Sequence, residues 1–277
     1  MTSHDVVARA RRGLGTRKVG HAGTLDPLAT GLLVLGIEGA TRLLTYLVGL
    51  DKEYLATIVL GAASSTDDID GELGERAAAS ALDAVSASHV VRVVESLTGH
   101  IRQRPSSVSA IKVDGKRAYA RARAGEEVVL AERDVVVSTF EVIERRRTQW
   151  VELDVRIECS SGTYVRALAR DLGEALGVGG HISALRRTRV GPLAVAEASD
   201  LDADLAAAVI DPALLAARLF PVLQLTATQA LDLSHGKAIA MDAPPGTRMA
   251  ALSPAGHLVG LVESREGRSR VLMNLRS

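Results

Sequence analysis

The stretch GHAGTLDPLATG, residues 20–31, places one carboxylate among small and turn-forming residues. Asp26 is followed directly by Pro27, and His21 precedes it in the same motif. An aspartate before a proline commonly caps the first turn of a helix. The alternative is that Asp26 is held for chemistry, because a carboxylate can assist bond cleavage by covalent attack, proton transfer or electrostatic stabilisation.

Two further segments carry polar residues that chemistry could use. KEYLATI has Tyr54 on an expected strand, and CSSGTYVRALARDLG has Tyr164 and Arg166 at the start of an expected helix. Taken singly, Tyr54 is most simply a core residue of the strand, and Arg166 is most simply a solvated residue of the helix. A cation is nevertheless disfavoured at a helix N-terminus, where the helix dipole favours anions. The position of Arg166 therefore indicates a carboxylate partner, for which Asp26 is the candidate.

Charge is balanced overall but unevenly distributed. The 33 Lys and Arg residues equal the 33 Asp and Glu residues, so net charge alone gives no reason to expect a nucleic-acid partner. Between Arg102 and Arg123, however, seven Lys and Arg residues accompany a single acid. Arginines recur at 186, 187 and 189, whereas acids gather at residues 67–72. Such segregation can present a basic face to phosphate groups.

Composition excludes several classes of protein. Cys159 is the single cysteine, so neither a disulfide framework nor a thiolate metal site can form within the chain. The seven histidines show no HxxxH or HxH spacing, and we expect no metal. No nucleotide-binding glycine motif, signal peptide or membrane-length apolar run is present, which predicts a cofactor-free cytoplasmic protein. Nothing suggests an obligate oligomer, so we expect a monomer.

The apolar pattern predicts an ordered series of elements. Helices are expected at residues 40–48, 82–97 and 163–177, and strands at 52–63, 134–144, 150–159 and after 181. Thr163 is the expected N-cap of the third helix, and Gly177 its end. The basic segment is expected to be a long loop with one short helix at 117–124. A boundary near 211–221 leaves about sixty residues, the size of a small β module.

Four segments follow one another along the chain: GHAGTLDPLATG, KEYLATI, CSSGTYVRALARDLG and HISALRRTRVG. In this order they resemble the bacterial tRNA pseudouridine synthases of the TruB type, which modify the uridine of the T arm. The resemblance extends from Met1 to about Gly191. It implies an α+β fold, with a mixed, largely antiparallel sheet flanked by helices and a small PUA-like C-terminal β module. A catalytic domain is then expected over residues 1–211, with an RNA-binding insertion at 100–130, and the C-terminal module over 218–277.

The resemblance also implies catalytic roles. Asp26 matches the catalytic aspartate of the family, and Arg166 matches the arginine that pairs with it. Tyr54 matches the tyrosine that stacks on the target base.

Substrate-binding roles follow in the same way. His21 matches a histidine beside the RNA loop, Tyr164 a tyrosine of the third motif, and Leu185 an apolar residue near the pocket. We expect basic residues of the insertion to bind phosphates, namely Lys112, Arg117 and Arg121.

The implied chemistry agrees with the residues available. Converting uridine to pseudouridine breaks the N1–C1′ bond and forms a C5–C1′ bond, so it needs neither a redox cofactor nor a group donor. The base must be flipped out of a folded RNA loop and held, commonly by stacking on an aromatic side chain. The sequence leaves three routes open: attack at C1′, attack at C6, or a glycal-type elimination.

Two other functions compete with this interpretation. A non-catalytic RNA-binding or RNA-folding protein on the same scaffold would use every basic and stacking residue, but it has no need of Asp26. A hydrolase acting on nucleosides through an aspartate nucleophile would not need the long basic insertion.

The N-terminus departs from the family pattern. Family members usually begin with a strand that ends in DKPxGxTS, whereas this chain starts at MTSHDVV, inside that motif. We therefore expect the first strand of the domain to be absent, or the true start to lie upstream.

Overall fold

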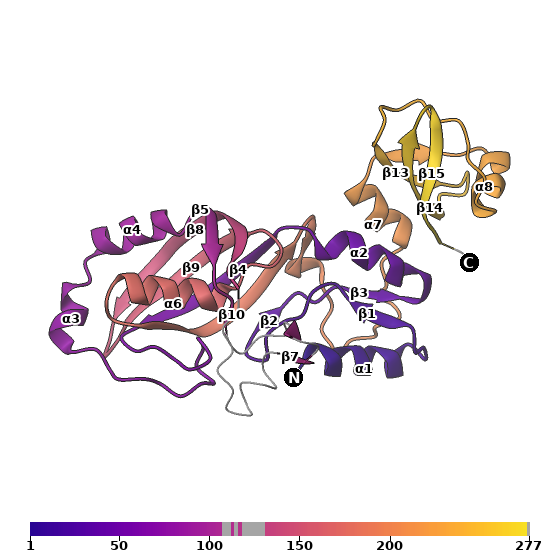
Figure 1. The fold of residues 1–277 in the computed structure, drawn as a ribbon. Coiled ribbons are helices and arrows are strands. Elements are labelled where there is room, and N and C mark those ends of the chain that lie inside the picture. Colours follow the sequence, from indigo (N-terminus) through magenta and orange to yellow (C-terminus); the bar gives the residue numbers. More distant parts are fainter. Residues whose placement is uncertain (107–111, 114–115, 118–130, 276–277) are drawn as a thin grey trace. The chain divides into compact units, whose positions relative to one another are not determined.

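The computed structural model describes residues 1–106, 112–113, 116–117 and 131–275 (Figure 1). The chain forms two compact units. The first, here called the sheet unit, comprises residues 26–32 and 49–196. The second, the terminal unit, comprises residues 1–25, 33–48 and 197–277.

Within its described residues, the sheet unit has one seven-stranded sheet. Its order is β11 (Leu193–Ala194), β10 (Gly180–Val190), β4 (Lys52–Leu60), β9 (Val151–Cys159), β8 (Arg133–Arg147) and β5 (Gly99–Gln103), and β2 (Thr30–Gly31) also pairs with β10. Neighbouring strands are antiparallel except for β2 and β10, which run parallel. The predicted mixed, largely antiparallel sheet is confirmed.

One face of this sheet is the core and the other is polar. Along β9 every second residue from Val151 to Cys159 is buried, while the intervening residues from Glu152 to Glu158 are partly exposed. Helices α4 (Ala87–Ser96) and α6 (Val165–Ala175) cover the buried face, as Figure 1 shows. The alternation is what a half-buried antiparallel sheet requires.

Some predicted helices are wrong in detail. The single helix expected at 82–97 is two helices, α3 (Ala79–Ala84) and α4. The chain breaks at Ser86 because its hydroxyl accepts a hydrogen bond from the His89 amide (3.2 Å) and so caps α4. The helix expected at 40–48 is a 3₁₀-helix, η1 (Glu38–Leu43), followed by α2 (Leu44–Val48).

The expected short helix at 117–124 lies mostly outside the described residues. The described part forms β6 (Lys112–Val113) and β7 (Lys116–Arg117), which pair antiparallel. Arg117, the first residue of the expected helix, therefore lies in a strand.

Helix α6 has the predicted extent with one correction at its start. Its N-cap is Tyr164 rather than Thr163, and no side chain caps it. Its end near Gly177 is confirmed, and that glycine adopts the left-handed conformation, with φ of 71°.

The terminal unit contains α1 (Ser3–Gly13), an antiparallel pair of β1 (Val19–His21) and β3 (Leu35–Ile37), α7 (Pro212–Leu219) and α8 (Ala227–Ser234). A second sheet has the order β12 (Val222–Gln224), β13 (Arg248–Leu252), β14 (Leu258–Arg265) and β15 (Arg268–Asn274). None of the described helices has the length and apolarity needed to cross a membrane.

The small C-terminal sheet shares its core with residues from the first fifty positions. Leu43 is buried in one cluster with Leu261 and Met273, and the guanidinium of Arg42 donates to the carbonyl of Asn274 (2.6 Å). The expected domain limits of 1–211 and 218–277, and the expected loss of a first strand, stay predictions.

The segment that carries Asp26 is attached to β10 by a very close crossing. The amide of Leu32 donates to the carbonyl of Arg187 (2.8 Å), and β2 pairs there in register. Gly31 has a φ of 94°, and a Cβ at this position would lie 2.2 Å from the carbonyl oxygen of Arg187. Only glycine fits this crossing.

We expect Gly31→Ala to lower the free energy of unfolding by about 3 kcal/mol, because backbone overlap is added to unfavourable φ. Gly177→Ala is the matched control, since Gly177 also has positive φ, but a methyl group added there would meet none of the described residues beyond its chain neighbours within 4 Å. The control should cost about 1 kcal/mol. Denaturant unfolding measures both, and equal losses in the two variants would contradict the close crossing.

Candidate active site

Asp26 lies in a turn and caps no helix. The amide of Ala29 donates to the carbonyl of Asp26 (2.9 Å), with Pro27 at the second position of the turn, and β2 follows at Thr30. Leu28 and Ala29 pack against the main core cluster, whereas the side chain of Asp26 is 35% exposed. The helix-cap explanation of this aspartate is therefore wrong, and its carboxylate is accessible.

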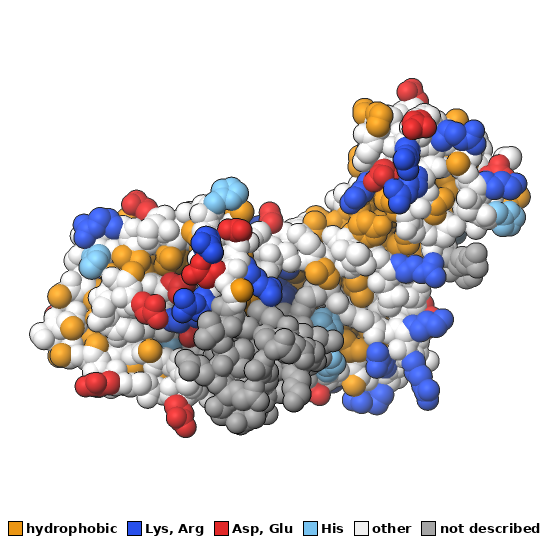
Figure 2. Space-filling model, in the orientation of Figure 1, with side chains coloured by type: hydrophobic (Ala, Val, Ile, Leu, Met, Phe, Trp, Pro, Cys, Tyr) orange, Lys and Arg blue, Asp and Glu red, His pale blue; other side chains and the backbone are white. Residues whose placement is uncertain are grey.

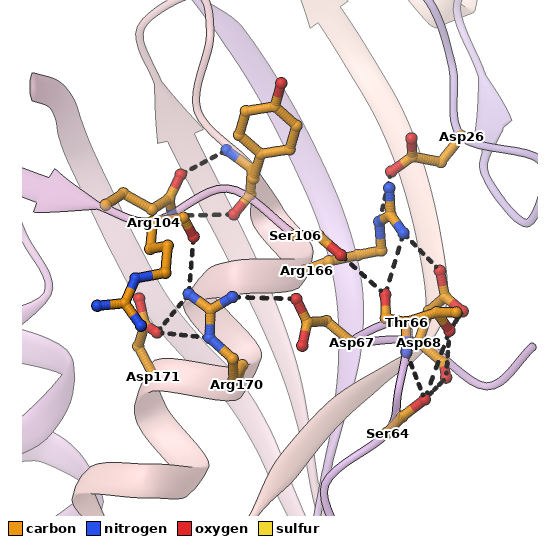
Figure 3. Close-up of polar contacts among 12 residues, drawn as sticks. Asp26, Ser64, Thr66, Asp67, Asp68, Arg104, Ser106, Arg166, Arg170 and Asp171 are labelled. Carbon is orange, nitrogen blue, oxygen red and sulfur yellow. Dashed lines mark hydrogen bonds and ion pairs between the residues drawn. The ribbon is translucent and has the colours of Figure 1, made fainter. Parts of the chain in front are cut away.

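Arg166 connects this carboxylate to the interior (Figure 3). Its Nε donates to Oδ2 of Asp26 (2.8 Å), and its Nη1 donates to Oδ2 of Asp68 and to the carbonyl of Thr66, both at 3.0 Å. The Arg166 side chain is only 5% exposed. The predicted pairing of Arg166 with Asp26 is confirmed, and it explains the cation in the first turn of α6. Such charge-assisted bonds fix the orientation of the carboxylate.

Asp68 is a site residue that the sequence analysis did not single out. Its side chain is 6% exposed, and its Oδ1 accepts hydrogen bonds from the Thr66 hydroxyl (2.6 Å) and the Asp70 amide (3.1 Å). The hydroxyl of Ser64 donates to the Asp68 carbonyl (2.5 Å). The polar run SSTDDIDG follows a buried strand, and such a run is typical of a turn held by side-chain hydrogen bonds. The acidic residues of the run, taken alone, indicated a surface patch.

This turn is fixed to β10. The amide of Ile182 donates to the carbonyl of Asp67 (3.0 Å), and the amide of Ile69 donates to the carbonyl of Ile182 (2.9 Å). The strand that holds the Asp26 segment at Arg187 therefore also holds the turn that supports Arg166.

Tyr54 and Leu185 lie on the helix-covered face of the sheet. In the register of β4 and β10, Tyr54 is opposite Arg187 and Ala56 is opposite Leu185. Directly opposed side chains share a face, and both Tyr54 and Leu185 pack in the main core cluster. The Leu185 residue is 6% exposed and belongs to the cluster against which Tyr54 packs.

Arg187 does not fit the expectation that arginines 186, 187 and 189 present a basic face to phosphate groups. It is 1% exposed, and its Nε donates to the carbonyl of Leu32 (2.8 Å). Its role is to hold the Asp26 segment on β10. The expected phosphate contact is therefore wrong for Arg187. Its neighbour Arg186 is exposed. Other exposed basic side chains of the molecule are blue in Figure 2.

Burial raises the pKa of Tyr54 to about 12. The positive charge of Arg187 opposes this shift, and the negative charge of Asp26 contributes to it. The hydroxyl of Tyr54 is therefore neutral at physiological pH and can donate a hydrogen bond.

Tyr164 is held at the start of α6 by a buried amide. The Tyr164 amide donates to Oε1 of Gln103 (2.7 Å), and Nε2 of Gln103 donates to the Tyr164 carbonyl (3.0 Å). Gln103 is 1% exposed. This pair of bonds fixes the backbone of the residue that begins α6.

Three predicted substrate-binding residues and His21 remain to be placed. His21 belongs to the terminal unit, where its ring meets that of His4 edge to face at 5.9 Å between centroids. Lys112 and Arg117 lie on β6 and β7, and Arg121 lies outside the described residues.

Ser3, the last residue of the N-terminal family motif, has a structural role in the terminal unit. The hydroxyl of Ser3 accepts a hydrogen bond from the Leu25 amide (2.9 Å) and donates to the Leu25 carbonyl (3.3 Å). It thereby fixes the residue that precedes Asp26 in the chain.

Family comparison covers nearly the whole sequence. Residues 11–165 match the N-terminal domain of the TruB family pseudouridylate synthases. Residues 166–225 match the tRNA pseudouridylate synthase B C-terminal domain, and residues 220–276 the C-terminal domain of tRNA pseudouridine synthase II. The chain belongs to the TruB family of pseudouridylate synthases. The predicted family and its enzyme class, an isomerase, are confirmed.

Curated relatives agree. The chain is 59% identical to tRNA pseudouridine synthase B of Leifsonia xyli subsp. xyli over 278 residues, 99% of this chain and 92% of the relative. It is 52% identical to the protein of that name from Rhodococcus jostii, with 100% and 90% covered.

Solved structures share the fold. A chain in the structure of an H/ACA RNP bound to a substrate RNA containing 2′-deoxyuridine matches with a TM-score of 0.72 at 23% identity, covering 100% of this chain and 82% of that one. A chain of a Cbf5-Nop10-Gar1 complex matches with a TM-score of 0.70 at 25% identity, covering 100% and 81%. The predicted α+β fold is confirmed.

We expect one tyrosine to titrate with a pKa near 12, and Tyr54→Phe to remove that component. An unfolded tyrosine loses its proton near pH 10. Between about pH 10 and 12 the unfolded chain therefore binds fewer protons than the folded chain, so Tyr54 makes stability fall as pH rises through this window. Phenolate absorbance of the parent minus that of Tyr54→Phe measures this titration, and a midpoint near pH 10 would contradict the burial.

Proposed function

We propose that this protein isomerises the T-loop uridine of tRNA to pseudouridine, with Asp26 as the carboxylate that acts at the breaking bond. The observation that carries the proposal is the accessible Asp26 carboxylate in a turn, bonded at 2.8 Å to a buried arginine from the third family motif. Relatives named tRNA pseudouridine synthase B support the choice of RNA. We further propose that it works as a monomer in the cytoplasm.

The described residues suit the steps that the reaction needs. Asp26 assists cleavage of the N1–C1′ bond, the uracil turns, and C5 bonds to C1′ while the proton on C5 is lost and N1 gains one. Arg166 keeps the carboxylate oriented throughout. Tyr54 offers a flat face to the base and a neutral hydroxyl.

The substrate must be unstacked and held. Flipping a base costs a few kcal/mol, which contacts to the flipped base and the backbone offset. We assign these contacts to Tyr54, Tyr164, Leu185 and His21. Phosphate contacts, which set the register of the RNA, are assigned to the basic residues of the insertion and to the exposed Arg186.

The decisive variant is Asp26→Asn, which keeps the shape of the side chain and removes its charge. Arg166 retains Asp68 and the Thr66 carbonyl, so the variant should fold. We expect tRNA binding within about threefold of the parent and a single-turnover rate lowered at least ~10³-fold, the loss of several kcal/mol of transition-state stabilisation. Carbodiimide mapping of pseudouridine in a T-arm hairpin measures the product.

Asp83→Asn is the matched control, since Asp83 is an exposed aspartate paired with Arg147. It should react at the parental rate. Arg166→Met should lower the rate less than Asp26→Asn, because the carboxylate remains without its orienting partner. Normal turnover by Asp26→Asn with normal RNA binding would refute the catalytic role of Asp26. A parent that binds the RNA but forms no pseudouridine would favour the RNA-binding alternative, and hydrolysis of free uridine would favour the nucleoside hydrolase.

Binding should depend on salt through the insertion. If Lys112, Arg117 and Arg121 each contact a phosphate, replacing all three with Gln should flatten the slope of log K against log salt by about 2–3. Asp26→Asn, titrated in parallel, should keep the parental slope. Fluorescence anisotropy of labelled tRNA at several salt concentrations measures both, and an unchanged slope in the triple variant would exclude these phosphate contacts.

A further inference from the structure

Arg170 is a partly buried arginine beside the candidate site, one helical turn after Arg166 on α6 (Figure 3). Its Nη1 donates to Oδ2 of Asp67 (3.1 Å), and its Nε and Nη2 donate to Oδ1 of Asp171 (2.9 and 2.8 Å). Nη2 also donates to the carbonyl of Arg104 (2.8 Å). The Arg170 side chain is 18% exposed.

The turn bonded to β10 directs two adjacent carboxylates to two different arginines. Asp67 has a φ of 60°, in the left-handed region, which is uncommon for a residue with a side chain. Asp67 is bonded to Arg170, while Asp68 is bonded to Arg166. Their side chains are 11% and 6% exposed, so neither carboxylate is well solvated.

Asp67 is sensitive to both arginines. Burial raises the pKa of the Asp67 carboxyl, and the charge of Arg170 is the largest effect that lowers it; a hydrogen bond from Ser106 and the charge of Arg166 also lower it, and Asp68 raises it. Arg166 is thus the next cation that Asp67 experiences. A buried carboxylate that loses its counter-charge is strongly unfavourable, so the loss of Arg170 would favour a contact between Asp67 and Arg166, the other cation that lowers its pKa.

Four carboxylates share the two guanidinium groups. Arg166 holds Asp26 and Asp68, and Arg170 holds Asp67 and Asp171. We propose that Arg170 is a positioning residue for the reaction: by binding Asp67, it keeps that carboxylate from competing with Asp26 for Arg166. This inference rests on the proposed function.

The test is Arg170→Met alone and combined with Asp67→Asn. In Arg170→Met, we expect the single-turnover rate of pseudouridine formation to fall about tenfold, with the Kd for tRNA within threefold of the parent. In the double variant the competing charge is gone, so the rate should return to within about threefold of the parent. A residue that merely anchors the turn would not be rescued by removing its partner.

Arg146→Met is the matched control, because it removes an arginine that binds Asp154 through both terminal nitrogens on the polar face of the same sheet. It should react at the parental rate. Thermal unfolding of every variant separates loss of folding from loss of rate. If Arg170→Met does not fold, the proposal is overturned, because the arginine is then needed for folding and not for the rate of the folded enzyme.

Two further results would overturn the proposal: parental turnover by Arg170→Met, or a double variant as slow as Arg170→Met. The parent and Asp26→Asn are run in the same assay. A parent that forms no pseudouridine would refute the proposed function itself, which is a different outcome from an active parent whose rate is indifferent to Arg170.

Discussion

The site depends on the bond between the buried guanidinium of Arg166 and the accessible carboxylate of Asp26. The contacts of the turn hold its backbone and its apolar residues, so they leave the side chain of Asp26 free to rotate unless another group binds it. The arginine supplies both orientation and counter-charge. It can do so only because it is itself fixed, through Asp68 and the Thr66 carbonyl, by a turn with its own network of hydrogen bonds.

Strand β10 brings these parts into one frame. The backbone of Ile182 bonds to the supporting turn, and the backbone of Arg187 bonds to the Asp26 segment. The same strand pairs with β4 so that Tyr54 lies opposite Arg187. A single rigid strand therefore sets the positions of the aspartate, the tyrosine and the support of the arginine, which agrees with the need of catalytic groups for rigid elements.

Much of this arrangement could be predicted from the sequence, but not its supporting contacts. The unfavourable position of Arg166 in the first turn of α6 indicated a carboxylate partner, and alternating apolar residues predicted β4, β8 and β9. Asp68 could not be found in this way, because its acidic neighbours indicate a solvated loop and nothing in the local pattern marks it as a second partner of Arg166. The burial of Arg187 and the break at Ser86 likewise depend on tertiary contacts that no local pattern encodes.

Exposure within the site follows the work that each group is proposed to do. The Asp26 carboxylate is about one-third exposed, whereas Arg166 and Asp68 are almost fully buried. A carboxylate that must reach a substrate cannot be enclosed, yet in water a single exposed ion pair is weak. Placing the arginine in the interior resolves this conflict, because its interaction with Asp26 is then only partly screened by solvent. The cost is a buried cation that needs a second, buried carboxylate, and Asp68 meets that need.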